Sequence, residues 1–196
     1  MVTAIESLPL RGNDLAVDFA NTVADVRTGR GEYLPTPHDL ARWGRHAGAL
    51  DAAELRLVLA SIRSHPTVAM RVHRRALALR TNLTRILTGR GQTVDVLALD
   101  RERLHTAERH LLAAKGSGYT LAWKGAPSLE LVIARVAEAA IALVASDRLA
   151  SVKQCDGQRC GWLFVDESRT RARRWCSMQD CGNRAKVRSF RQRQVS

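Results

Sequence analysis

Residues 155–186 specify the fold of the C-terminal part and read CDGQRCGWLFVDESRTRARRWCSMQDCGNRAK. It holds all four cysteines of the 196-residue chain, Cys155, Cys160, Cys176 and Cys181. Each pair is spaced C-x4-C, and fifteen residues separate the two pairs. Two close thiolate pairs joined by a loop are typical of a structural zinc site. No histidine follows residue 110, so the four sulfurs are the only soft ligands in this region.

Two disulfides, or four free thiols, are the alternatives to zinc at these cysteines. The first ten residues contain Glu6 and no apolar run, so we expect no signal peptide. Clustered cysteines in an unsecreted chain favour a metal over disulfides. Four protein thiolates leave no open coordination position, so we expect a structural zinc and not a catalytic one. A redox-switched site, which releases zinc on oxidation, is a further alternative, although no residue pattern favours it.

Positive charge is concentrated around the cysteines. The chain has a formal net charge of +12, and residues 151–196 carry 11 Lys and Arg against 4 Asp and Glu. A compact basic segment of this kind favours a polyanionic partner, most simply nucleic acid. Helical periodicity stops near residues 149–153, so we predict an N-terminal domain over residues 1–150 and a zinc finger over 151–196.

The N-terminal 150 residues are predicted to form a mainly helical domain with a small β element, so the chain as a whole is α+β. Capping signals predict helices that begin at 36–39 and at 51–54. Longer helices are predicted over 67–87, 94–114 and 128–144, the first two of them closed by Gly89 and Gly116. Residues 118–124 read as a strand and 27–34 as a loop, while 14–24 fit helix and strand equally well.

Within the finger we predict a short hairpin and a C-terminal helix. Residues 162–165 form an apolar strand, and the residues after Cys181 suit a helix. Val187 and Phe190 lie three residues apart on that helix and are expected to pack on the zinc module. The basic side chains at i, i+4 and i+7 are expected to share the opposite face.

The basic residues of this helix and of the preceding loop are the candidate DNA contacts. A helix that leads from a zinc site is suited to the major groove or to phosphates, and the loop is suited to phosphates. The set is Arg169, Arg171, Arg173, Arg174, Arg184, Lys186, Arg188, Arg191 and Arg193. Their alternative role is a solubilising surface, or counter-charge to the zinc–thiolate centre.

Asp18, Asn21 and Thr22 are polar residues in an otherwise apolar stretch. Buried polar groups need hydrogen-bond partners, so we expect these three to lock a turn or cap a helix. The alternative is that they line a pocket for a small-molecule effector, which would make the N-terminal domain a sensor.

Motifs for catalysis and for membrane insertion are missing from the sequence. It contains no glycine-rich phosphate loop, serine elbow or paired-carboxylate motif. His105 and His110 are five residues apart, so they do not share a face of the helix predicted there. No segment approaches 18 consecutive apolar residues. We therefore expect a cytoplasmic protein without a membrane span that is not an enzyme.

Two parts of the chain resemble a known family. The cysteine pairs, with GWLF at 161–164, RRWC at 173–176 and CGNR at 181–184, are similar to the CGNR zinc finger, which is named after those last four residues. LAVDFANT at 15–22 and TPHDLARW at 36–43 resemble the ABATE domain usually found before that finger. The resemblance implies a mixed, mainly helical domain followed by a zinc finger, in proteins regarded as stress-response transcription regulators.

Together these features predict a zinc-dependent DNA-binding transcription regulator whose N-terminal domain senses or dimerises. A homodimer is the economical arrangement, because one small finger buries little DNA surface. The alternative is an interaction module in which zinc only stabilises a basic tail, and this tail binds an acidic protein. RNA ranks below DNA, because few aromatic side chains are placed to stack on bases.

Overall fold

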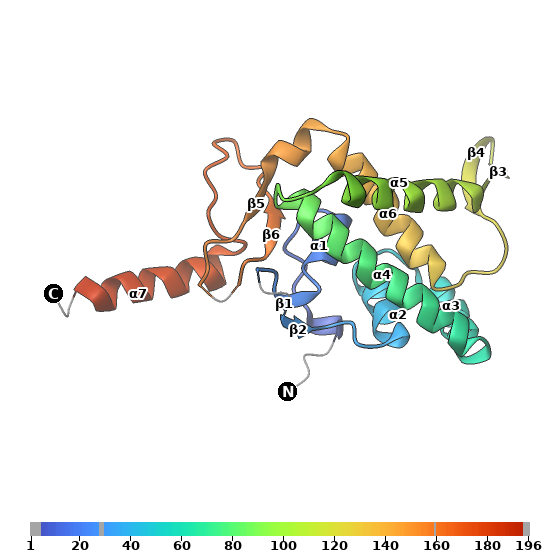
Figure 1. The fold of residues 1–196 in the computed structure, drawn as a ribbon, viewed down its shortest axis with the longest axis horizontal. Helices are drawn as coiled ribbons and strands as arrows, with labels where there is room; N and C mark the ends of the chain where they lie inside the picture. The colour runs from blue at the N-terminus through green and yellow to red at the C-terminus, as the bar shows by residue number, and fades with distance from the viewer. Residues whose placement is uncertain (1–4, 28–29, 159, 194–196) are drawn as a thin grey trace.

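The computed structural model describes residues 5–27, 30–158 and 160–193 (Figure 1). Helices make up most of the N-terminal part. They are α1 (Leu15–Ala20), α2 (Pro37–His46), α3 (Ala52–Ser64), α4 (Pro66–Leu87), α5 (Thr93–Glu108) and α6 (Glu130–Val144). A short 3-10 helix, η1 (Ile5–Ser7), precedes them.

Local caps explain where two of these helices begin. Thr36 accepts a hydrogen bond from the Asp39 backbone, and the Asp39 side chain accepts one from the Thr36 backbone in return. Asp51 and Glu54 form the same reciprocal pair at the start of α3. Each pair satisfies N–H groups that the first helical turn would otherwise leave without a partner. The predicted helix starts at 36–39 and 51–54 are therefore confirmed.

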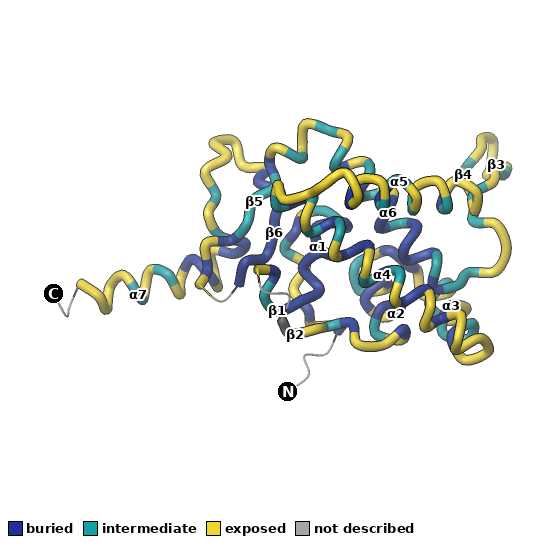
Figure 2. Tube along the Cα trace, viewed as in Figure 1, coloured by how far each residue is buried: buried dark blue, intermediate teal, exposed yellow. Residues whose placement is uncertain are grey.

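The core of the N-terminal part is built around α6 and α1. Helix α6 buries Val132, Val136 and Leu143 almost completely, and α1 packs against both α6 and α4. The rings of Phe19 and Trp43 lie 5.2 Å apart at its centre. Figure 2 shows this buried core in dark blue, running through the helices toward the C-terminal module.

Two hairpins in the N-terminal part correct the predicted elements. Helix α5 ends at Glu108, and β3 (His110–Lys115) pairs antiparallel with β4 (Gly118–Trp123), so the helix predicted over 94–114 is too long. Gly116, at φ 59°, lies in the two-residue turn, where strand pairing outweighs a weak helical preference. Likewise β1 (Val23–Asp25) pairs with β2 (Arg30–Glu32), so part of the predicted 27–34 loop is a strand.

The C-terminal part contains the predicted hairpin and helix. Strand β5 (Val152–Gln154) pairs antiparallel with β6 (Leu163–Val165). A 3-10 helix, η2 (Asp147–Ser151), leads into the hairpin, and a π-helical turn, η3 (Met178–Gly182), leads into α7 (Asn183–Arg193). The side chains of β6 are buried in the same hydrophobic cluster as those of α1 and α6. The finger hairpin is thus docked on the N-terminal helices.

Helix α7 projects away from the body of the molecule (Figure 1). It buries none of its side chains, and its exposed surface appears in yellow in Figure 2. Val187 is 49% exposed and Phe190 is 56% exposed. The expectation that these two residues pack on the zinc module is therefore wrong.

Candidate zinc centre and basic surface

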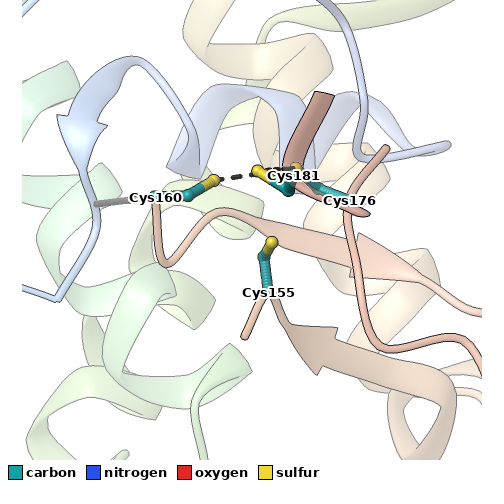
Figure 3. Close-up of side chains that lie close together, drawn as sticks. All are labelled: Cys155, Cys160, Cys176 and Cys181. Carbon is teal, nitrogen blue, oxygen red and sulfur yellow. Dashed lines mark hydrogen bonds between the residues drawn. The ribbon is translucent and has the colours of Figure 1, made fainter. Parts of the chain in front are cut away.

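Four cysteine side chains converge where the finger's segments meet (Figure 3). All four are buried, and their Sγ atoms lie within 4.8 Å of one another. The Sγ atoms of Cys160 and Cys176 are 3.6 Å apart, and those of Cys176 and Cys181 are 3.8 Å apart. A tetrahedron with zinc–sulfur bonds of about 2.3 Å has edges of about 3.8 Å. The space between the sulfurs therefore fits a zinc ion.

The protonation of the sulfurs also points to a cation. Hydrogen bonds from Cys160 and Cys176 hold the pKa of the Cys155 thiol far below its usual range. The hydrogen bond with Cys155 raises the pKa of the Cys160 thiol to about 12, and the bonds with Cys155 and Cys160 raise that of Cys176 as well. Sulfurs this close cannot all ionise alone, and a divalent metal removes the conflict because it favours every thiolate.

Backbone and side-chain groups around the sulfurs support the thiolate form. The Gly157 N–H points at Cys155 Sγ from 3.4 Å, and the Arg184 guanidinium donates to Cys181 Sγ at 3.1 Å. A Cβ atom at Gly157 would lie 3.1 Å from Cys181 Sγ, so a larger residue there would press on the sulfur cluster. Arg184 therefore acts as counter-charge to the cluster, the alternative role considered for the basic residues.

The loop between the two cysteine pairs is organised by Asp166. This side chain is fully buried and forms an ion pair of 2.8 Å with Lys153. It also accepts hydrogen bonds from Ser168 and from the Arg173 backbone N–H. Burial opposes ionisation of Asp166, but these bonds outweigh it and hold its pKa well below the usual range.

The candidate DNA contacts in this loop differ in their surroundings. The Arg173 guanidinium lies 4.5 Å from the centre of the Phe164 ring and donates to the carbonyls of Trp175 and Cys176. Arg174 pairs with Asp156 at 2.8 Å but stays largely exposed. Arg169 and Arg171 are exposed, with Arg171 in a left-handed conformation at φ 46°.

The candidate contacts on α7 fall into two groups. Arg184 and Arg188 turn toward the loop between Cys155 and Cys160. There they line a small cavity with Gly157 and Gln158. Lys186, Arg191 and Arg193 are exposed and do not line this cavity, and Arg184 is exposed too in spite of its bond to Cys181. The attraction between arginine and thiolate accounts for this orientation, because it turns the Arg184 face inward and leaves Val187 and Phe190 outside.

Asn21 connects the N-terminal helices to the finger. Its side chain donates to the Leu163 carbonyl at 2.8 Å and accepts from the Leu163 N–H at 2.8 Å. The pair lies 142 residues apart in the chain and is buried. Asn21, the residue that caps the C-terminal end of α1, thus bonds the edge of β6 in the way a neighbouring strand would.

Thr22 and Asp18 also have hydrogen-bond partners. The Thr22 hydroxyl donates to the Phe19 carbonyl at 2.7 Å and accepts from Arg80 at 2.9 Å. Asp18 accepts from the Gly12 N–H at 2.7 Å, and burial raises its pKa to about 6.

Two further residues that join the domains carry no signal in the sequence. The Arg27 guanidinium donates to the Gly157 carbonyl at 2.7 Å and to the Cys155 carbonyl, although Arg27 belongs to a segment expected to be a plain loop. The Trp162 indole donates to the Val23 carbonyl at 2.8 Å. Both contacts join segments that lie far apart in the sequence, so they can be recognised only in the folded molecule.

Within the described ranges, no helix is both long and apolar enough to cross a membrane.

Comparison with known proteins agrees with this architecture. A family model described as "CGNR zinc finger" matches residues 151–194. The ABATE model, described as "Putative stress-induced transcription regulator", matches residues 13–147, which is more than half of the chain. Neither is a family of enzymes, and no curated protein matches the chain. The chain therefore belongs to the ABATE family and carries a C-terminal CGNR zinc finger, whose zinc site is formed by Cys155, Cys160, Cys176 and Cys181.

Proposed function

We propose that the protein is a zinc-dependent, DNA-binding transcription regulator of the cytoplasm. The observation that carries the proposal is α7, a basic helix that projects from the body and buries no side chain. A free helix of eleven residues is about 16 Å long and narrow enough to enter a major groove about 12 Å wide.

The outward face of α7 has the chemistry that DNA recognition requires. At 100° per residue, Lys186 and Arg193 lie opposite Arg184, and Phe190 lies between them and Val187. Cations on this face suit phosphates, and an exposed aromatic ring suits the methyl group of thymine. Arg169 and Arg171, in the loop before the second cysteine pair, extend the same basic character.

The position of α7 depends on the finger. Bound zinc supplies the cross-link between the two cysteine pairs. Cys181 lies in the turn that precedes α7, and Arg184 ties the first turn of the helix to the Cys181 sulfur. Asn21, Arg27 and Trp162 hold the other side of the finger to the N-terminal helices. A conformational change in the N-terminal domain can therefore be transmitted to α7, which supports a sensing role for that domain. A homodimer would supply a second finger and so enlarge the surface that contacts DNA.

Removal of three exposed cations tests the DNA-binding role. The variant Lys186→Gln/Arg191→Gln/Arg193→Gln leaves Arg184 and the zinc site intact. In an electrophoretic shift we expect weaker DNA binding, and the slope of log affinity against log salt should become shallower by about 3, because about one counterion is released per phosphate contact. The matched control neutralises three exposed arginines on the far helices, Arg56, Arg63 and Arg74.

Equal affinity and equal salt slope for the two triple variants would contradict the assignment. Both proteins carry the same net charge, so the comparison separates α7 from a general electrostatic effect. Zinc content and helical circular dichroism, measured in parallel, confirm that each variant is folded.

An interaction module that binds an acidic protein is the second candidate. The exposure of Val187 and Phe190 favours it, because such apolar side chains are also typical of protein contacts. Selection of duplexes from a random DNA pool separates the two functions. A recovered motif preferred over scrambled DNA by about 10³ indicates a regulator, and no enrichment indicates the interaction module.

A further inference from the structure

A cavity of about 730 Å³ lies in the N-terminal part of the molecule, and one of its lining residues, Arg27, bonds the finger. Its walls come from the end of α4, the start of α5, β1 and the turn after β1 that holds Arg27. This volume is within the range of about 300–1,000 Å³ that is usual for small-molecule sites.

The cavity is strongly cationic. Four arginines line it, Arg27, Arg80, Arg85 and Arg90, against one carboxylate, Asp95. Two of the four are compensated, because Arg80 pairs with Glu32 at 2.8 Å and Arg85 pairs with Asp95 at 2.9 Å.

The other two arginines bond only neutral acceptors in the described part of the chain. Arg27 donates to backbone carbonyls, and Arg90 donates to the Thr88 hydroxyl at 3.1 Å. Thr81, Thr84 and Gln92 add further polar groups to the lining. A site with excess cations and hydrogen-bond donors is suited to an oxyanion, and the arginine fork matches phosphate geometry.

One wall of the cavity is apolar. It is formed by Ala20, Val23 and Val26. The cavity is also much larger than inorganic phosphate, so an organic group fits beside the anion. We propose that this cavity binds a small organic phosphate, and that this ligand is the effector of the regulator proposed above.

The position of Arg27 indicates how the ligand would reach the finger. Its guanidinium already bonds the Cys155 and Gly157 carbonyls, at the start of the loop between the first two cysteines. A phosphate bound by Arg27 changes the strength of its bonds to the Cys155 and Gly157 carbonyls. It thereby acts on the loop between Cys155 and Cys160, which helps to place α7. This step rests on the proposed function, whereas binding in the cavity does not.

Calorimetry on the zinc-loaded full chain tests the site without DNA. The probes are inorganic phosphate, glucose 6-phosphate, AMP and, as a carboxylate, citrate. We expect one phosphate ester to bind at one per chain and more tightly than inorganic phosphate. Arg90→Gln should weaken that binding at least about tenfold, since a hydrogen bond to a charged group is worth about that factor or more. The matched control is Arg101→Gln, an exposed arginine of α5 outside the cavity lining.

The α7 triple variant distinguishes the cavity from the basic finger. Binding of the ester should persist in it, because none of its three changes lines the cavity. The proposal is overturned if no ester binds saturably, if Arg90→Gln and Arg101→Gln bind alike, or if the α7 variant alone loses binding. Tighter binding of citrate than of every ester would overturn the phosphate assignment. DNA affinity is measured separately, so failure of this site and failure of DNA binding remain distinct.

Discussion

Replacement of Asn21 by alanine is expected to separate the finger from the N-terminal helices. Asn21 is 2% exposed and forms two hydrogen bonds of 2.8 Å with the backbone of Leu163. Alanine removes both bonds and leaves the Leu163 N–H and carbonyl groups buried in a space that the side chain had filled.

The magnitude follows from those two orphaned groups. A buried donor or acceptor without a partner costs about 1–3 kcal/mol, so the two together cost about 2–6 kcal/mol. Domains are stable by about 5–15 kcal/mol, so a loss of this size is a large fraction of the total. Asn21→Asp should be at least as harmful, because its second oxygen would face the Leu163 carbonyl.

Urea unfolding of the zinc-loaded protein measures this loss, with helical circular dichroism and tryptophan fluorescence as two probes. The control is Asn82→Ala in α4, whose side chain has only a long contact of 3.5 Å with Arg85. We expect the control to stay within about 0.5 kcal/mol of the parent protein. A loss below about 1 kcal/mol for Asn21→Ala, or one no larger than the control's, would refute the role of Asn21 as the clamp.

Three further predictions concern zinc, pH and the buried ion pair. Chelation of zinc should lower the urea midpoint of the helical signal as well as that of the finger, because β6 lies in the shared core, and added zinc should restore both; an unchanged helical midpoint would contradict a shared core. Since the pKa of Asp18 is raised from 3.8 to about 6, the folded state holds this proton more tightly, so its contribution to stability should decline by about 3 kcal/mol in all as pH rises from about 3 to 7. The free energy of unfolding of Asp18→Asn should therefore rise relative to that of the parent protein over that interval. A difference between the two that does not change with pH would contradict the raised pKa of Asp18. Asp166→Asn should cost about 1.5–3 kcal/mol in urea unfolding, because it removes the charge-assisted bond from Lys153 to a buried carboxylate, whereas exposed Glu167→Gln should cost below about 1 kcal/mol; equal losses would refute the role assigned to Asp166.

Features with local causes could be predicted from the sequence. The zinc ligands follow from the spacing of the four cysteines, and the starts of α2 and α3 follow from caps within four residues. The strand at 163–165 and the helix after Cys181 are also confirmed. In each case the signal and the structure it specifies lie in the same short segment.

Predictions that depended on a neighbouring segment were less successful. Residues 110–115 have the composition of a helix end, yet they pair with β4 because the turn at Gly116 brings the two segments together. Val187 and Phe190 have the right spacing to pack, yet the bond from Arg184 to Cys181 orients α7 so that both side chains stay exposed.

The zinc site, the helical character of the N-terminal part and the concentration of positive charge near the C-terminus can therefore be predicted from the residues alone. Three further features become visible only in the folded molecule: Asn21 bonds Leu163, Arg27 reaches the loop between Cys155 and Cys160, and four arginines share one cavity. The physical reason is distance along the chain. Caps, periodicity and ligand spacing act over a few residues, whereas these contacts join side chains and backbone groups that only a packed core brings together.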